Sequence, residues 1–462
     1  MEPTLKSNLY QLGFGISASL SIATAGAWLA WPSAVIPMIE KDGIPMKMTE
    51  GEISTMVALM DLGNILSPVP ASYLMDKIGR RPTLMSAGVC AIIASAAVML
   101  ANGVCLIYAA RIFAGFTKGI AYAVLPIYAA EVANTKVRGG LTAVSMVFLT
   151  LGTTVDYAIG PHFSYQALNI TNAIIPILLL STIMFFPESV HFLAMKGKHD
   201  QALNALAKYR QVKKENAKEN GLEAEYQEVS RKVEEDMRDK GRFLDLISTP
   251  ANKRALMIIS LLAFFQRSTG ISPIIAYSTS TMPKEGGGLS ISEYMIVFSV
   301  VHAITAYGVM PLVDRLGRRP LMLFSSLTTG LVTGFIGVYY WMERSGYDVR
   351  DIQWIPYAGL VLFAITYGAG AGIIPSTIVG ELFPTNIKSY ASSVSAIILA
   401  AVSFTLNKIF HVVAKSYGAH VMFWSFTAAS FLCTLFTYVF LFETKGKTFT
   451  EIRDYMAKLC EK

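Results

Sequence analysis

Two loops of this 462-residue chain repeat one charged pattern, and the residue types in that pattern indicate a specific chemistry. The segment 76–82, DKIGRRP, matches the segment 314–320, DRLGRRP. A glycine lets such a loop turn sharply, and an aspartate beside paired arginines can make charge-assisted hydrogen bonds to neighbouring helix ends. The repeat therefore predicts a duplicated chain with two equivalent charged loops, each able to hold one conformation in place.

Four ionisable side chains fall inside apolar stretches of the first half: Asp61, Arg111, Lys118 and Asp156. A charge at the centre of a membrane-spanning helix costs on the order of +2.5 to +3.5 kcal/mol. Because two acids balance two bases, the acids can pair with the bases and hold the first half together. The polar context of Asn64 and Tyr157 leaves a second interpretation open, in which Asp61 or Asp156 binds a proton or orients a substrate.

The second half adds Arg267 and His302, with no acid obvious at the same depth. Arg267 facing a wet cavity could donate several hydrogen bonds to a sugar or bind a carboxylate. The alternative is that Arg267 snorkels or pairs with Asp61. His302 is more typical of a hydrogen bond between helices than of a proton relay.

Long apolar helices must position these groups, and twelve stretches of the sequence have the required character. They begin near Gly13, Ile53, Pro82, Cys105, Leu141, Ile174, Ala255, Glu293, Pro320, Ile355, Ser389 and Val421. We expect a six-helix bundle over 1–187, linker helices over 188–254, a second bundle over 255–442 and a tail over 443–462. Pro68 and Pro70, Pro273, and the glycine-rich stretch 368–372 with Pro375 are expected to break helices.

Composition places the chain in a membrane and excludes several other classes. Hydrophobic residues make up 53% and charged residues 15% of the chain, with a mean hydropathy of +0.47, which is more apolar than a soluble core requires. The basic residues of the short loops fall on one side, which predicts cytoplasmic termini: Lys77, Arg80, Arg81, Lys136, Arg138, Arg315, Arg318, Arg319, Lys388, Lys445 and Lys447. This bias accounts for the net charge of +7 without nucleic-acid binding.

Further motifs in the expected order resemble the sugar porter family of the major facilitator superfamily over nearly the whole chain. The duplicated loop is that superfamily's signature, and Pro187-Glu188-Ser189 matches the motif that opens the family's central loop. The other matches are Arg111, Gly115, Gly119, Pro126, Tyr128, Glu131, Arg138, Gly139, the segment 381–384 with Lys388 in place of the usual arginine, and the segment 443–448. The stretches 25–33 and 61–64 are similar to one branch, the insect facilitated trehalose transporter-like proteins.

The resemblance implies a major facilitator fold, which is all-α and integral to the membrane, and a set of cytoplasmic gating residues. Acids of this set are expected to pair with arginines when the pore faces outward, and opening those pairs would open the inside. The set comprises Asp76, Arg80, Arg81, Glu131, Arg138, Glu188, Asp314, Arg318, Arg319, Glu381, Lys388 and Glu443. The alternative is that these are solvated charges that serve only topology.

Carried over position by position, the resemblance also gives six substrate-binding candidates: Gln266, Arg267, Ser272, Tyr277, His302 and Ser376. Only Gln266, Gly270 and Tyr277 keep the family's seventh-span residues, and Met146 and Leu399 stand where other sugar contacts are usual. The sequence therefore leaves the cargo open.

We expect a facilitative sugar porter of the plasma membrane, a monomer that carries trehalose or a hexose by alternating access. The first span has no acid where proton-coupled relatives place one, which favours facilitated diffusion. A proton-coupled porter, an organic-anion porter and a transport-dead sugar sensor remain as alternatives. No nucleotide loop, metal-ligand spacing or nucleophile motif is present, so we expect no enzyme activity, no cofactor and no metal.

Overall fold

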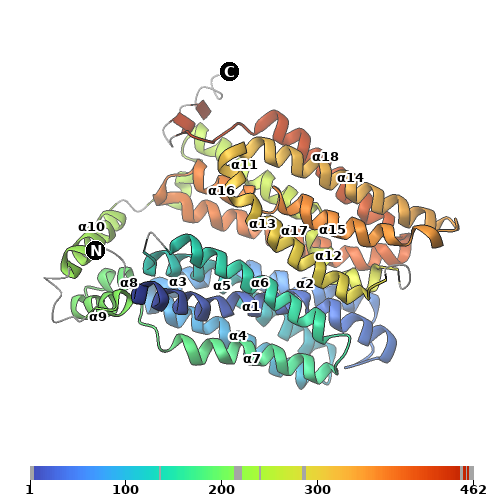
Figure 1. Cartoon of the computed structure of the whole chain (residues 1–462), viewed down its shortest axis with the longest axis horizontal. Helices are drawn as coiled ribbons and strands as arrows, with labels where there is room; N and C mark the ends of the chain where they lie inside the picture. Colours follow the sequence, from blue (N-terminus) through green and yellow to red (C-terminus); the bar gives the residue numbers. More distant parts are fainter. Residues whose placement is uncertain are drawn as a thin grey trace. The chain divides into compact units, whose positions relative to one another are not determined.

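A computed structural model describes residues 5–134, 137–212, 221–238, 241–283, 288–447, 451–453 and 455–456. All regular structure in this described part is helical (Figure 1). The first seven helices are α1 (Leu5–Asp42), α2 (Glu50–Leu66), α3 (Pro68–Ile78), α4 (Arg80–Met99), α5 (Val104–Val132), α6 (Arg138–Ile159) and α7 (Tyr165–Ile183). Each of the first six expected spans begins inside or at the start of one of these helices.

The remaining helices form the linker and the second half. The linker holds α8 (Val190–Met195), α9 (His199–Arg210), α10 (Leu222–Arg238) and the 3₁₀ turn η2 (Phe243–Ile247). The second half holds α11 (Pro250–Ser268), α12 (Ile271–Thr281), α13 (Ile291–Leu316), α14 (Arg318–Arg344), η3 (Arg350–Ile352), α15 (Trp354–Gly368), α16 (Ile374–Leu382), α17 (Thr385–Tyr417) and α18 (Ala419–Phe440).

These helices account for twelve membrane spans. In the described residues, nine helical stretches are long and apolar enough to cross a bilayer. The other three spans are α6 and two helices that are broken into the pairs α2 with α3 and α15 with α16. The breaks lie at Ser67 before Pro68 and at 369–373, and a third separates α11 from α12 at Gly270. The prediction of breaks near the prolines and the glycine-rich stretch is therefore confirmed.

Contacts group the chain into two compact units. One unit contains Met1–Trp28, Gly63–Thr153 and Gln166–Lys240, and the other contains Leu29–Leu62, Thr154–Tyr165 and Gly241–Lys462. The second unit thus includes the C-terminal part of α1 and most of α2 as well as the second half of the chain. The bundle boundaries expected from the sequence stay a prediction.

The first unit packs around aromatic residues from α1, α5 and α9. The Phe14 ring contacts the Tyr128 ring edge-on at a centroid distance of 4.6 Å, and the hydroxyls of both Tyr128 and Tyr209 donate to the Pro187 carbonyl. The linker helices α8, α9 and α10 share a smaller apolar core that includes Phe192, Leu206 and Tyr226. The Ser7 hydroxyl on α1 donates to the Tyr209 carbonyl on α9 at 3.0 Å, which joins the linker to the same unit as α1.

Small residues let helices approach closely, as is usual in membrane bundles. A Cβ added at Gly63 on α2 would lie 2.2 Å from the Ile112 carbonyl oxygen and 2.9 Å from the Gly115 Cα, both on α5. These neighbours are backbone atoms that cannot rotate away. Gly63 is therefore required by the contact between α2 and α5.

We expect Gly63→Ala to lower the stability of the purified protein by about 1–3 kcal/mol, because the added methyl group overpacks a rigid backbone contact. Gly308→Ala is the matched control, since a Cβ at Gly308 on α13 meets nothing within 4 Å. Thermal unfolding in detergent measures both changes. Equal melting temperatures for the two variants would contradict the assignment of Gly63 as a contact residue.

Candidate functional site

The two repeated loops form two ion-pair clusters with the same geometry. In the first loop cluster, the Arg80 guanidinium lies 2.9 Å from a Glu131 carboxylate oxygen and 3.7 Å from the Asp76 carboxylate. The Glu188 carboxylate accepts the backbone N–H groups of Arg80 and Arg81, at 3.0 and 3.1 Å. A carboxylate thus satisfies the first N–H groups of α4, which have no partner within the helix.

The second loop cluster repeats these contacts residue by residue. The Arg318 guanidinium lies 2.7 Å from the Glu381 carboxylate and 3.0 Å from the Asp314 carboxylate. The Glu443 carboxylate accepts the backbone N–H groups of Arg318 and Arg319, at 3.0 and 3.1 Å. The repeat in sequence is therefore a repeat in three dimensions, formed within each half separately.

The glycine of each loop is needed for this packing. Gly79 has φ of 111° and Gly317 has φ of 97°, a region that favours glycine. A Cβ at Gly79 would lie 2.2 Å from a Glu188 carboxylate oxygen, and one at Gly317 would lie 2.5 Å from a Glu443 carboxylate oxygen. The absent side chain makes room for the carboxylate.

Other predicted gating residues have different partners. Arg81 donates to the Phe186 carbonyl at 3.0 Å, and Arg319 donates to the Tyr438 carbonyl at 2.7 Å. Lys388 is exposed, and no ion pair joins it to an acid in the part of the chain that the structure describes. The side chain of Arg138 lies outside the described residues.

The six substrate-binding candidates lie on the second half, and several gather where helices are broken. Gln266, at the end of α11, donates from Nε2 to the Gly372 carbonyl at 3.0 Å, in the break between α15 and α16. Arg267 donates to the Ser272 hydroxyl at 3.4 Å, and Ser272 shares a 2.9 Å hydrogen bond with Ser403 on α17. Gln266 thus joins two interrupted helices.

The remaining candidates are spread more widely. His302 on α13 packs between the Phe298 ring and the Tyr367 ring, at centroid distances of 6.2 and 5.8 Å. Tyr277 is fully buried and donates to the Asn407 carbonyl at 2.8 Å. Ser376 is exposed and donates to the Ile373 carbonyl of its own turn at 2.7 Å.

Two of the buried charges have hydrogen-bond partners that the sequence did not indicate. Asp61 accepts a 2.8 Å hydrogen bond from the Asn407 side chain, and Arg111 donates to the Trp28 carbonyl at 2.9 Å. Lys118 and Asp156 are buried, and both interact with other described residues. Asn407 could have been suspected as an amide in an apolar span, although it lies eight residues after Leu399, where the family pattern suggested a contact.

Arg267 lacks the acidic partner that its position in a span would favour. Its Nε atom is buried without a hydrogen-bond partner, and in the described residues no carboxylate pairs with it. Pairing with Asp61, one of the alternatives raised by the sequence, is therefore not observed. A cationic donor group remains available beside Gln266.

Ser325 on α14 satisfies the backbone of the broken helix. Its hydroxyl donates to the Thr366 carbonyl at 2.7 Å and accepts the Ala371 N–H at 2.8 Å. Irregular backbone at membrane depth is tolerated only where such partners exist. Ser325 was missed by sequence reasoning because an isolated serine in an apolar span carries no local signal.

A comparison of the sequence with known families decides its class. The family described as "Sugar (and other) transporter" matches residues 10–455. The chain belongs to this family. Its members are transporters, so the chain is a membrane transporter and not an enzyme.

Individual relatives agree with this membership. The chain is 26% identical over 461 residues to "Facilitated trehalose transporter Tret1" of Culex quinquefasciatus, covering 99% of this chain and 87% of that protein. It is 27% identical over 448 residues to the Tret1 of Polypedilum vanderplanki, covering 96% and 88%. The inward open structure of the xylose transporter XylE from E. coli matches with a TM-score of 0.79 at 19% identity, over 96% of this chain and 99% of that one. This chain thus has the major facilitator fold.

We expect Glu443→Gln to lower the melting temperature of this transporter more than Glu188→Gln. Burial raises the pKa of Glu443, but hydrogen bonds from the backbone of Lys445, Arg318 and Arg319 outweigh it and bring the pKa below its ordinary value. Burial raises the pKa of Glu188, and its backbone hydrogen bonds only partly offset that effect. The Glu443 carboxylate is therefore the better stabilised of the two.

Thermal unfolding across pH tests this difference. A lowered pKa gives stability that is present above the ordinary carboxylate pKa and is lost as the pH falls, so the penalty of Glu443→Gln should shrink on acidification towards about pH 4. The raised pKa of Glu188 has the opposite effect on stability. Its contribution to the free energy of unfolding is present at low pH and is lost as the pH rises. A larger penalty for Glu188→Gln at neutral pH would refute the ordering.

We expect Ser325→Ala to destabilise the protein by about 2 kcal/mol, because the Ala371 N–H and the Thr366 carbonyl both lose a partner in a water-free region. Ser393→Ala is the control, since the Ser393 hydroxyl bonds the Ser389 carbonyl of its own helix. Melting temperatures in detergent compare the two. A loss no larger than that of the control would show that the break is satisfied in another way.

Proposed function

We propose that this transporter carries an uncharged sugar, trehalose or a hexose, by facilitated diffusion. The observation that carries the proposal is the hydrogen bond from Gln266 to the Gly372 carbonyl, which brings an amide to the point where two helices are interrupted. Sugars need amide and hydroxyl partners for their hydroxyl groups and an aromatic face for their C–H surface. The Ser272 hydroxyl, which bonds Arg267, supplies a hydroxyl partner. The ring of Tyr367, whose side chain interacts with Gln266, supplies an aromatic face.

Two further features support the choice of cargo and mechanism. The relatives at 26% and 27% identity are named as facilitated trehalose transporters. The acids of α1, Glu40 and Asp42, lie in its last turn, so no acid occupies its apolar part. Asp61 accepts a hydrogen bond from Asn407, which favours a structural role over proton exchange.

We further propose that transport follows an alternating-access cycle controlled by the two loop clusters. Solute binding near the middle of the membrane would lower the barrier to moving one six-helix bundle against the other. The bundles are taken as 1–187 and 255–442, joined by the linker 188–254. Separation of the acids Glu131, Glu188, Glu381 and Glu443 from their arginines and backbone partners would accompany opening on the side of these loops.

The same proposal includes a location and an orientation. The basic residues of the short loops favour cytoplasmic termini, and the plasma membrane is the expected location. The proposed functional unit is a monomer.

Uptake into liposomes tests the proposed function. The purified protein should take up labelled trehalose or glucose with saturation, and an imposed proton gradient should not change the rate. Gln266→Ala should lower the uptake at subsaturating sugar by about tenfold, the effect of losing one hydrogen bond worth about 1.4 kcal/mol. Gln166→Ala, at an exposed position near the start of α7, should leave uptake unchanged.

Other outcomes would select among the alternatives. Uptake of an organic anion that is lost in Arg267→Gln would replace the sugar with an anionic cargo. Dependence on the proton gradient would contradict facilitated diffusion. Binding of sugar without any uptake would indicate a sensor.

A further inference from the structure

A cluster of four ionisable side chains joins α1, α2 and α17, and none of the features above accounts for it. Glu40 lies in the last turn of α1, Glu50 begins α2, and His411 and Lys415 lie one turn apart near the end of α17. We call these four residues the α17 cluster. The Lys415 ammonium lies 2.6 Å from Glu40 and 2.9 Å from Glu50, so it bridges the two carboxylates.

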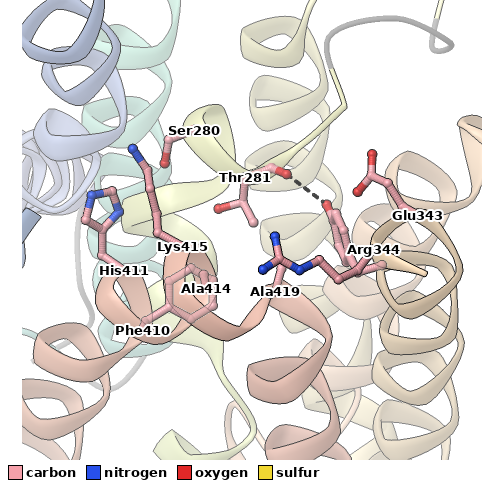
Figure 2. Close-up of a pocket in the computed structure, with 11 residues that line it drawn as sticks. Ser280, Thr281, Glu343, Arg344, Phe410, His411, Ala414, Lys415 and Ala419 are labelled. Carbon is pink, nitrogen blue, oxygen red and sulfur yellow. Dashed lines mark hydrogen bonds between the residues drawn. The ribbon is translucent and has the colours of Figure 1, made fainter. Parts of the chain in front are cut away.

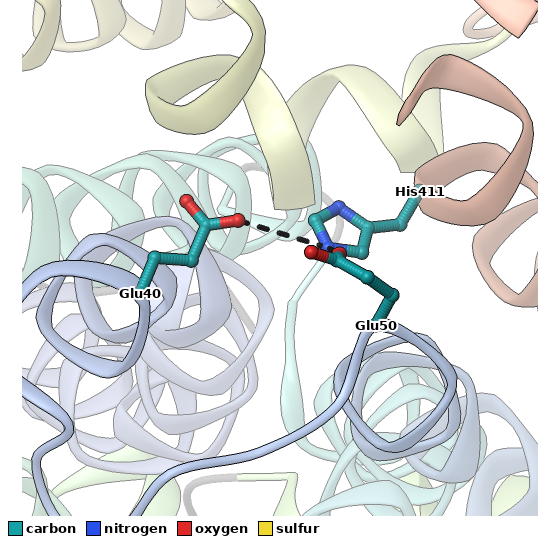
Figure 3. A group of neighbouring side chains, drawn as sticks. All are labelled: Glu40, Glu50 and His411. Carbon is teal, nitrogen blue, oxygen red and sulfur yellow. Dashed lines mark ion pairs between the residues drawn. The ribbon is translucent and has the colours of Figure 1, made fainter. Parts of the chain in front are cut away.

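Three of these side chains present metal-ligand atoms to one another (Figure 3). A Glu40 carboxylate oxygen, a Glu50 carboxylate oxygen and His411 Nε2 lie within 4.8 Å of one another. Zn²⁺ bound to nitrogen and oxygen at about 2.0–2.2 Å in a tetrahedral site places its ligand atoms roughly 3.3 Å apart. Glu40 and His411 are already 3.8 Å apart, and His411 contacts Glu50. Small side-chain rotations would therefore suffice to close the site.

The histidine is oriented for this role. His411 is only 3% exposed, and its ring stacks on Tyr277 at a centroid distance of 5.3 Å. Its Nε2 contacts the Glu50 carboxylate and lies 3.8 Å from a Glu40 carboxylate oxygen. Packing thus holds a buried imidazole nitrogen towards two carboxylates.

Lys415 is the cation that competes with a metal ion for both carboxylates. Its side chain is 45% exposed on a flexible stem. It also lines a cavity of about 470 Å³ together with His411, Ser280, Thr281, Glu343 and Arg344 (Figure 2). The cavity gives an ion a path to the cluster that is lined by polar and charged side chains.

We propose that Glu40, Glu50 and His411 bind a divalent transition-metal ion of the Zn²⁺ type, and that the bound ion inhibits transport. An imidazole with carboxylates suits Zn²⁺, whereas Mg²⁺ and Ca²⁺ prefer oxygen ligands alone. His411 lies 26 residues along α17 from its first residue, Thr385, near the second loop cluster, which is roughly 40 Å at 1.5 Å per residue. The ion would therefore tie α1 and α2 to α17 at the far end of the spans.

Direct binding of Zn²⁺ to the full-length purified protein, followed by calorimetry, tests the site. We expect His411→Ala and Glu50→Gln each to weaken Zn²⁺ binding by about tenfold or more, since each removes a ligand. Lys415→Met should strengthen binding by about tenfold, because it removes the cation that competes for both carboxylates. Mg²⁺ should not compete with Zn²⁺.

His199→Gln is the matched control, because it removes an exposed histidine at the start of α9 in the linker. It should leave Zn²⁺ binding unchanged. If His411→Ala and Glu50→Gln both bind Zn²⁺ with wild-type affinity, the proposed site is wrong. It is also wrong if Lys415→Met binds Zn²⁺ no more tightly than the wild type. Melting temperatures without metal identify a variant that fails to fold, and the other ligand variant then decides.

The inhibitory effect rests on the proposed sugar transport and is measured separately. Zn²⁺ should slow sugar uptake in liposomes at the concentrations at which it binds, and His411→Ala should abolish this inhibition. Binding at the cluster without slower uptake would overturn the inhibitory role and leave the site in place. If no sugar is transported, the calorimetric experiment still decides the metal site.

Discussion

Lipid offers no hydrogen bonds, so every peptide group in the spans must find its partner within the protein. Most spans of this chain meet that requirement with unbroken helices. Where a helix is interrupted, side chains must supply the missing hydrogen bonds. Between α15 and α16, Ser325 accepts the Ala371 N–H and donates to the Thr366 carbonyl, while Gln266 donates to the Gly372 carbonyl. Ser325 and Gln266 therefore support an interruption that a bilayer would otherwise forbid.

A related requirement, that the first N–H groups of a helix need acceptors, explains the repeated loops. Helices α4 and α14 each begin directly after a glycine with positive φ, and their first N–H groups would be left without partners. Glu188 and Glu443 supply the acceptors from distant parts of the chain. Because the acceptors are charged, the helix starts are coupled to the arginines beside them, and a movement of either segment must disturb both.

Charge is concentrated at the two ends of the spans and is sparse between them. Within the second unit, the second loop cluster lies near the start of α17 and the α17 cluster lies near its end. Each cluster joins helices that are far apart in the sequence. The groups around Gln266 and Tyr367, in the middle of the spans, are mostly neutral. This distribution suits a neutral cargo in the middle and conformational control at the ends, with Arg267 as the one predicted binding residue that departs from it.

The sequence by itself determined the number of spans, the duplicated loops, the positions of the helix breaks and the family. These features depend on hydropathy, glycine and proline, which act over short stretches of chain. Tertiary structure alone decided that Asn407 bonds Asp61, that Ser325 supports the break near Ala371, and that Glu40 and Glu50 meet His411 and Lys415. These partners are separated by 46 to 375 residues. A single polar residue in an apolar helix does not indicate which distant helix it will face.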